Sequence, residues 1–358
     1  MPDPHYSVFK RPLQIAAALA TAAGLLLVLQ ACTGDSLGPD HGNDPLSVSP
    51  GELTQAPARI VWCRDIGTMK DVYALENRLE LVGFDTEDGR GARIIVPGPR
   101  NISRPVISPD GNYVFFSDRE DNFVYRVDWN GEHLVRFARG RALETWQNPE
   151  TGRHWVLIGD AQAEHPRLHS AVSRHRVHNA NISETVCDDF VINENNFQLS
   201  KSGRFASADV KDTGNGIIDL EKSVFHKKGG GCWPSIAPDD SRRFWRMSHG
   251  HRELIMHGPE GNHKMDLSCA PGIDGHEVFH PRWSNHPRFL VISGPYKEGI
   301  GFTRVRNGGP GVEIYLGKLS PDYKKIESWC RVTADEYADF YPDAWIGRTT
   351  PCSTSPAR

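Results

Sequence analysis

The sequence predicts an all-β protein that folds as a single β-propeller of about six four-stranded blades. Turn signals built from Pro, Asp, Gly and Asn recur between short runs of β-branched and aromatic residues. The unit returns at a period of roughly 35 to 60 residues, which is typical of arrays whose units bury their faces against each other. The first and last units are each incomplete and complement one another. A composition with 34 Gly and 25 Pro suits such a fold and leaves room only for few, short helices.

Residues 1–31 predict a secretory signal peptide. Lys10 and Arg11 precede an apolar run that ends at Leu29, and a small residue stands before Cys32. The ending from Leu29 to Cys32 resembles the bacterial lipobox, and this resemblance implies that Cys32 is the first mature residue and carries lipid. The chain would then be anchored at the bacterial cell envelope, on its periplasmic or cell-surface side. The alternative is an uncleaved transmembrane anchor, because the run approaches the roughly 18 apolar residues that a membrane span requires.

Residues 32–57 predict a flexible tether, since they are rich in Gly, Pro, Ser and Asp and contain few large apolar residues. We assign 58–348 to the propeller and 349–358 to a C-terminal tail. The mature part exceeds a typical domain, but a propeller builds one ring from many small sheets.

The clearest blade runs from Ser103 to Ala138. Two tight turns, at 109–111 and 129–131, separate runs rich in Val, Phe and Tyr, so the segment predicts four short antiparallel strands. Further copies begin at Leu143, Asn196, Cys232 and His280.

The two incomplete units predict how the ring closes. The segment from Tyr341 to Ile346 is typical of an innermost strand with no blade after it. Arg59 to Cys63 is typical of a second strand with none before it. Joining them leaves no free sheet edge. The turn repeats over most of 58–348 resemble the TolB-like propeller family, a resemblance that implies fold rather than function.

The chain has 7 Cys, of which six remain after Cys32 is set aside. An even number in an oxidising compartment favours three disulfides, and no closely spaced pair suggests a thiolate metal site. The blade assignment suggests a bridge from Cys232 to Cys269, and a bridge from Cys63 to either Cys330 or Cys352 that would latch the ring.

Any chemistry is expected on the face formed by the loops that enter the innermost strands and by the loops that join second to third strands. We call this the entry face. Loops of the fifth and sixth blades bring His, Arg and aromatic residues there, and we expect at least three of His249, His251, His276, Glu277, His280 and Arg282 to share one cavity. Arg252, Tyr296 and Lys297 complete the candidate ligand-binding set. Earlier blades add Arg104, Asp118, Arg119, His165, Asp209 and Asp212 to this face.

Each candidate also has a plain structural explanation. Trp233, Trp283 and Trp345 stand at similar places in their repeats, so packing between blades explains them more simply than stacking on sugars. With 16 His in the chain, some clustering is expected by chance. A divalent metal ion is a candidate cofactor, but no spacing signature identifies its ligands.

A second resemblance concerns residues 275–293, which are similar to blades of oligogalacturonate lyases. It implies His276 and His280 as metal ligands, His249 or His251 as the catalytic base, and Arg252 or Arg282 as a clamp for a uronate carboxylate. Arg282 stands where the second of the enzymes' paired histidines would fall. No Gly-x-Ser-x-Gly, His-Glu-x-x-His or phosphate-loop motif supports another hydrolytic chemistry.

Two function hypotheses follow. The first is a lipid-anchored binding module for an envelope glycan or protein, and the second is a metal-assisted polysaccharide lyase. The first requires no particular set of side chains and is therefore preferred. Net charge is −4 with no basic run, so nucleic acid is excluded as a partner. We expect a monomer whose ligand is anionic or metal-bridged.

Overall fold

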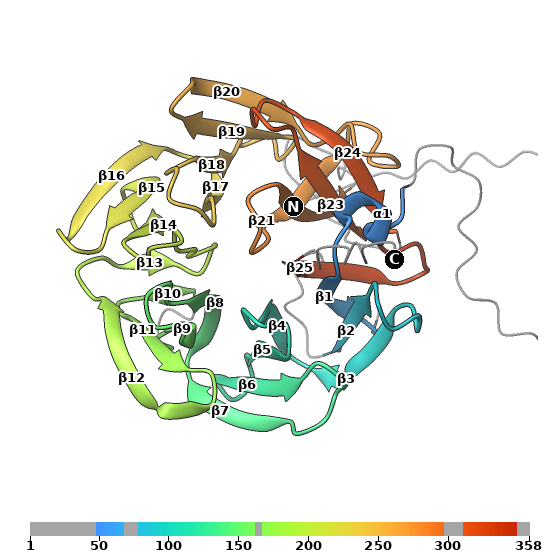
Figure 1. Ribbon diagram of the computed structural model, residues 1–358, viewed down its shortest axis with the longest axis horizontal. Coiled ribbons are helices and arrows are strands. Elements are labelled where there is room, and N and C mark those ends of the chain that lie inside the picture. The colour runs from blue at the N-terminus through green and yellow to red at the C-terminus, as the bar shows by residue number, and fades with distance from the viewer. Residues whose placement is uncertain (1–47, 68–77, 162–166, 297–310, 349–358) are drawn as a thin grey trace, which may run out of the picture. The chain divides into compact units, whose positions relative to one another are not determined.

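The computed structural model describes residues 48–67, 78–161, 167–296 and 311–348. These form six antiparallel sheets arranged around a central channel (Figure 1). The predicted all-β, six-bladed propeller is therefore confirmed. Within the described ranges, no helix is long and apolar enough to span a bilayer.

The first three blades lie between residues 58 and 187, except for the strand that closes the ring. Blade 1 consists of β25 (Ala338–Ile346), β1 (Ala58–Asp65), β2 (Leu79–Asp85) and β3 (Arg93–Arg100). Blade 2 consists of β4 (Ile102–Ile107), β5 (Tyr113–Asp118), β6 (Phe123–Asp128) and β7 (Val135–Arg139). Blade 3 consists of β8 (Arg141–Gln147), β9 (His154–Gly159), β11 (Val172–Arg176) and β12 (Asn179–Cys187).

Blade 4 has five strands, because the chain leaves blade 3 after β9 and adds a short strand to the next sheet before it returns as β11. The strands of blade 4 are β10 (Leu168–His169), β13 (Ile192–Asn193), β14 (Phe205–Val210), β15 (Gly214–Asp219) and β16 (Val224–Gly229). Blade 5 consists of β17 (Cys232–Ile236), β18 (Phe244–Met247), β19 (Glu253–Gly258) and β20 (Gly261–Asp266). Blade 6 consists of β21 (Glu277–Trp283), β22 (Phe289–Tyr296), β23 (Glu313–Leu319) and β24 (Ile326–Arg331).

The ring closes as predicted. β25 pairs antiparallel with β1 from Ala58–Ile346 to Asp65–Ala338, and Figure 1 shows the red strand beside the blue one. β25 supplies the hydrogen-bond partners that the inner edge of β1 would otherwise lack, so blade 1 is a complete four-stranded sheet.

The C-terminal boundary predicted for the tether, residue 57, lies too far along the chain. Helix α1 (Pro50–Thr54) begins at a capping box in which Ser49 and Glu52 satisfy each other's backbone N–H groups. Leu53 is buried in a hydrophobic cluster with residues of β1 and of β23. The chain therefore packs against the propeller some residues before the first strand.

Tryptophans at the ends of innermost strands join neighbouring blades. The Nε1–H of Trp345 donates to the carbonyl of Pro109 at 2.9 Å, and that of Trp146 donates to the carbonyl of Lys201 at 3.0 Å. Trp283 stacks on Trp245 with ring centroids 3.7 Å apart. Trp283 and Trp345 thus pack between blades as expected.

The expected disulfides that can be checked are absent. Among the described residues Cys63, Cys187, Cys269 and Cys330 are free thiols, so neither a Cys232–Cys269 bridge nor a Cys63–Cys330 bridge forms. Burial raises the pKa of the Cys187 thiol to about 11 and that of Cys330 to about 12, which makes both poor nucleophiles. These cysteines act as small apolar residues of the strand cores. Cys32 and Cys352 lie outside the described residues.

Candidate functional site

The innermost strands of four blades contain the same irregularity. In each, a residue with φ between 46° and 56° precedes a proline, and the strand register shifts at this pair. Arg104 and Pro105, for example, lie in the shift between Ser103 and Val106. These are β-bulges, in which proline is tolerated because it has no N–H to contribute to the ladder. The residues in the left-handed conformation are Arg104, Trp233, His280 and Tyr341.

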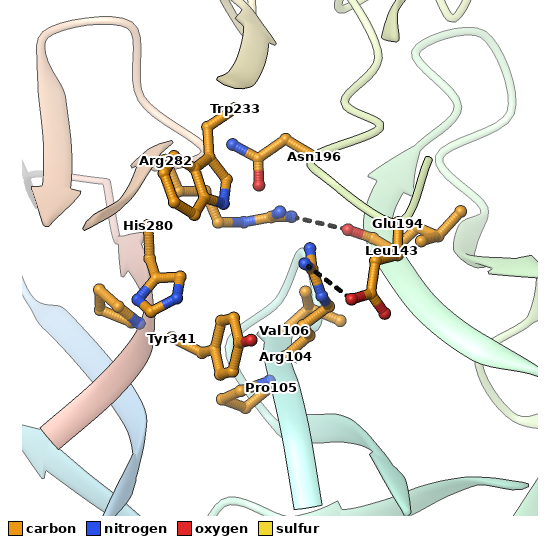
Figure 2. A pocket seen from close by; sticks show the side chains of 11 residues that line it. Arg104, Pro105, Val106, Leu143, Glu194, Asn196, Trp233, His280, Arg282 and Tyr341 are labelled. Carbon is orange, nitrogen blue, oxygen red and sulfur yellow. Dashed lines mark hydrogen bonds and ion pairs between the residues drawn. The ribbon is translucent and has the colours of Figure 1, made fainter. Parts of the chain in front are cut away.

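The bulges place one side chain from each blade around the channel. Leu143 and Asn196 take the corresponding positions in the two blades without the proline, so that all six blades contribute to one cavity. Figure 2 shows how these side chains converge from the surrounding strands. The cavity has a volume of about 20 Å³, which is room for little more than one water-sized particle.

A second layer of side chains closes the channel on the other side of this cavity. Arg282 Nε lies 2.8 Å from the carboxylate of Asp343, and its Nη2 lies 3.1 Å from that of Glu144. Gln198 donates to the carbonyl of Trp283 at 3.2 Å. Burial by itself lowers the pKa of Arg282, but the two carboxylates outweigh it and raise the pKa above its usual value. The layer is therefore a paired, charged partition.

On the entry face, three arginines surround one carboxylate. Glu194 is 3% exposed, and Arg167 Nε lies 2.9 Å from its Oε1. Arg104 and Arg119 approach the same oxygen at 3.8 and 3.7 Å, beyond hydrogen-bond distance. Burial alone would raise the pKa of Glu194, but the three guanidinium groups lower it to about 2. The carboxylate is therefore ionised at any physiological pH.

The sequence-predicted residues divide into those in the channel and those beside it. Of the six residues expected to share one cavity, His280 and Arg282 line the channel cavity. His280 is buried and its Nδ1 lies 2.8 Å from the hydroxyl of Ser293. The expectation that at least three of the six meet in one cavity is not met at the channel.

His251 and Glu277 pair with each other next to the channel. His251 Nδ1 lies 3.1 Å from a Glu277 carboxylate oxygen, and its ring packs 4.6 Å from Phe279. Tyr296 is fully buried and lies within hydrogen-bond distance of Ser293, so it belongs to the wall rather than to a ligand surface. A ligand contact of Tyr296 stays a prediction, because the structure contains no ligand that could test it.

The remaining candidates are dispersed. His249 is exposed beside Gly230, His276 and Arg252 are half-buried, and Lys297 lies outside the described residues. Arg282 is already bound to two carboxylates of the protein, so it is not available as a carboxylate clamp.

The described residues do not fit the metal site that the lyase resemblance implies. A group of three or more side chains with ligand atoms close enough for one ion occurs among them at Glu313, Asp335 and Asp339, and neither His276 nor His280 belongs to it. Arg64 and Arg331 pair with these carboxylates. The group is therefore a salt-bridge network of the ring closure.

A larger cavity lies on the opposite face, where the turns between first and second strands meet. We call it the funnel. Its volume is about 580 Å³, and its floor includes Glu144 and Asp343 of the partition. Its wall carries mostly neutral polar, proline and tryptophan side chains, including Pro109, Thr145, Trp146, Gln147, Asn148, Asn285 and Trp345, together with the charged Lys201. Ligand pockets of proteins commonly have about this size.

Comparison with known proteins identifies the fold. No family profile matches the chain, and no curated protein is similar to it in sequence. TolB from Acinetobacter baumannii superimposes with a TM-score of 0.53 at 12% identity, over 82% of this chain and 67% of that one. The chain has the TolB-like propeller fold.

Two further structures are more distant. A TolB-type protein from Agrobacterium tumefaciens gives a TM-score of 0.47 at 14% identity, over 80% of this chain and 90% of that one. Oligogalacturonate lyase in complex with manganese gives 0.36 at 11% identity, over 50% of this chain and 53% of the enzyme. The TolB-like fold is shared by proteins of unrelated function, so activity must be argued from the site.

Sequence reasoning placed Arg104 and Arg119 on the entry face but missed Glu194 and Arg167. Glu194 stands two residues before Asn196 and lines the same cavity, but the chain from 194 to 198 has no regular strand, so no periodicity in the sequence pointed to Glu194. Trp233 was also misplaced, because it precedes Pro234 and lines the cavity, whereas Trp283 and Trp345 follow their prolines.

Proposed function

We propose that this protein is a binding module of the bacterial cell envelope, anchored by lipid on Cys32, whose funnel takes the end of a glycan chain. The lipobox-like ending at Cys32 supports the address. The TolB-like propeller supports a binding role, since such a ring is a rigid scaffold that presents loops for recognition.

The observation that carries the proposal is the size and chemistry of the funnel. It is a blind depression of about 580 Å³. This volume suits a short oligosaccharide or a peptide end rather than a folded domain. Amide and hydroxyl side chains outnumber charges on its wall, including Gln147, Asn148 and Thr145. Such groups both donate and accept, which matches the hydroxyl groups of a sugar.

The wall is also held in place before a ligand arrives. Asn285 exchanges two hydrogen bonds with the backbone of Ile346, at 3.0 and 2.7 Å. The Nε1–H groups of Trp146 and Trp345 are fixed to the turns of neighbouring blades. A preorganised wall reduces the conformational entropy that binding would otherwise cost.

No observation favours the lyase hypothesis. Its candidate metal ligands are not gathered, and its candidate clamp Arg282 is occupied by Glu144 and Asp343. His251, a candidate base, is paired with Glu277.

The experiment measures binding of the full chain to a panel of neutral and acidic envelope glycans by titration calorimetry. Gln147→Ala with Lys201→Ala removes two exposed funnel side chains and is expected to weaken binding about tenfold, since each lost hydrogen bond accounts for about 0.5 to 1.5 kcal/mol. His249→Ala on the entry face is the matched control and should leave affinity unchanged.

The reverse pattern, in which only the His249 variant loses affinity, would move the site to the entry face. The wild type could instead bind no glycan but capture an envelope protein. If the funnel variant lost that capture, the ligand of the funnel would be a protein rather than a glycan. Absorbance from unsaturated uronate in the same samples would show cleavage of the glycan and would favour the lyase hypothesis.

A further inference from the structure

We infer that the channel cavity holds one small monovalent anion, of the size and charge of a chloride ion, between the side chains of Arg104 and Trp233. This site is separate from the funnel, because the partition of Arg282, Asp343 and Glu144 lies between them. The inference therefore does not depend on the proposed function.

The first argument is the hydrogen-bond inventory of the cavity wall. Arg104 and Trp233 line the cavity, and the Arg104 Nε–H and Trp233 Nε1–H groups are buried without a hydrogen-bond partner. Arg119 likewise has no hydrogen-bond partner for its Nε and Nη2 groups, since Nη2 lies 3.7 Å from the Glu194 carboxylate. All of these are donors. A buried donor left unpaired costs about 1 to 3 kcal/mol, so a wall that gathers several of them calls for an acceptor.

The second argument is charge. Arg282 is paired with Glu144 and Asp343 in the partition, and the Arg167 side chain is 65% exposed to solvent. On the entry side of the partition, the largely buried guanidinium groups of Arg104 and Arg119 share a single carboxylate among the described residues, that of Glu194. Arginine remains protonated at any accessible pH, so these three buried side chains carry one more positive than negative charge. A monovalent anion neutralises it.

The neighbouring histidine does not alter this balance. His280 lines the same cavity, and burial, followed by the nearby Arg104 and Arg119, lowers its pKa well below the usual value. The imidazole is therefore neutral. It therefore leaves the net charge around the cavity unchanged.

The third argument is size and shape. The cavity of about 20 Å³ accepts little more than one water-sized particle, which excludes phosphate, sulfate and sugar carboxylates. The backbone that forms it is held in an unusual conformation, because both Arg104 and Trp233 have positive φ angles, at 51° and 46°. Such conformations persist where the surrounding structure enforces them, commonly at sites that hold a ligand.

The direct test is diffraction from crystals of the full chain grown in sodium bromide, with data collected at the bromine absorption edge. We expect an anomalous peak within about 3.5 Å of Trp233 Nε1 and Arg104 Nε. A parallel crystal grown in sodium formate tests whether the cavity also accepts a small carboxylate or only a halide. A cavity that contains only water in bromide crystals overturns the inference, and so does a cation there.

The second measurement uses thermal unfolding at constant ionic strength, with chloride replaced by gluconate. Chloride should raise the melting temperature of the wild type along a saturating curve, because an ion that binds only the folded state stabilises it. Trp233→Phe removes one donor and should shift the half-saturating chloride concentration at least tenfold upward.

The matched control is Trp62→Phe, since Trp62 is also fully buried without a partner for its Nε1–H but belongs to a different hydrophobic cluster. Its chloride response should equal that of the wild type. Equal responses in all three proteins would overturn the inference. If Trp233→Phe does not fold, the bromide crystals of the wild type decide alone.

Discussion

Single residues with a left-handed backbone determine what the channel of this propeller contains. A non-glycine residue in this conformation costs on the order of 1 kcal/mol or more, and four innermost strands accept that cost next to a proline. In return, the bulge directs a side chain such as His280 or Tyr341 to the axis while the next residues resume the strand.

The buried carboxylate of Glu194 should stabilise the fold strongly. Replacing it in Glu194→Gln leaves Arg104, Arg119 and Arg167 facing each other, so we expect the free energy of unfolding at neutral pH to fall by about 3 kcal/mol. Glu184→Gln is the control. Its ion pair with Arg174 is half exposed and should account for less than about 1 kcal/mol. Chemical denaturation measures both.

The pH dependence of this effect has a definite sign. The pKa of Glu194 is about 2 in the folded protein, below its usual value of 4.5. Its contribution is therefore fully present above about pH 4.5 and is lost as the pH falls towards 2. The difference between wild type and Glu194→Gln should shrink over this interval. A difference that stays constant down to pH 2.5 would contradict the ion-pair explanation.

Asp339 should act in the opposite direction. Burial raises its pKa from 3.8 to about 7, against the lowering effect of Arg64. The folded protein then binds more protons than the unfolded chain between about pH 4 and 7, so this residue makes stability fall as the pH rises through that window. Asp339→Asn should flatten the dependence of the melting temperature on pH there. An unchanged slope in the variant would show that other groups control it.

Among the structural elements, β25 contributes to the ring in three ways. It completes blade 1, and it also carries Asp343, which closes the channel, and Asp339, which binds Arg64 of β1. Ending the chain after Asp335 should therefore lower the melting temperature of the whole propeller and expose β1 as a free edge. Differential scanning calorimetry would measure this. A truncated protein that melts with the full chain would mean that β25 contributes only locally.

The elements that the sequence predicted well are those with strong turn chemistry. Blade 2 and the closing strand follow from Pro-Asp-Gly turns and from the complementary incomplete units. β10 was not predicted, because a strand of two residues shows no periodicity. Helix α1 was assigned to the tether on composition, although Ser49 and Glu52 have the spacing of a capping box.

The candidate site was harder to predict, for a physical reason. Loop position indicates the face on which a residue lies, but not whether a partner already occupies its side chain. His251 and Arg282 lie where expected, yet Glu277, Glu144 and Asp343 bind them. The sequence analysis therefore assigned His251 and Arg282 to ligand binding, whereas the structure pairs them with carboxylates of the protein itself.

At the scale of the whole molecule, the partition divides the propeller into two independent faces. The funnel opens on one side, and the cationic cluster around Glu194 lies on the other. Substitutions on one face should leave binding on the other unchanged, which is why His249→Ala on the entry face serves as the control for the funnel variant.

The localisation of the protein at the membrane is a separate prediction. Cys32→Ala removes the thiol that lipid attachment requires, so the variant should be found in the soluble envelope fraction or remain unprocessed. Fractionation with immunoblotting, and a shift in mass on metabolic labelling with a fatty acid, would check it. Membrane association that persists without labelled lipid would favour the uncleaved transmembrane anchor.

The pairing of β1 with β25 also bears on how the chain is made. The ion pair between Arg64 and Asp339 joins residues 275 positions apart. A ribosome must therefore synthesise nearly all of the chain before the first blade can acquire its innermost strand. Contacts this remote are costly to form early, so the nascent chain should stay incompletely folded during synthesis. If the chain is exported as we propose, a machinery that threads unfolded polypeptides would receive it in a suitable state, and the ring would close only after the last strand had crossed.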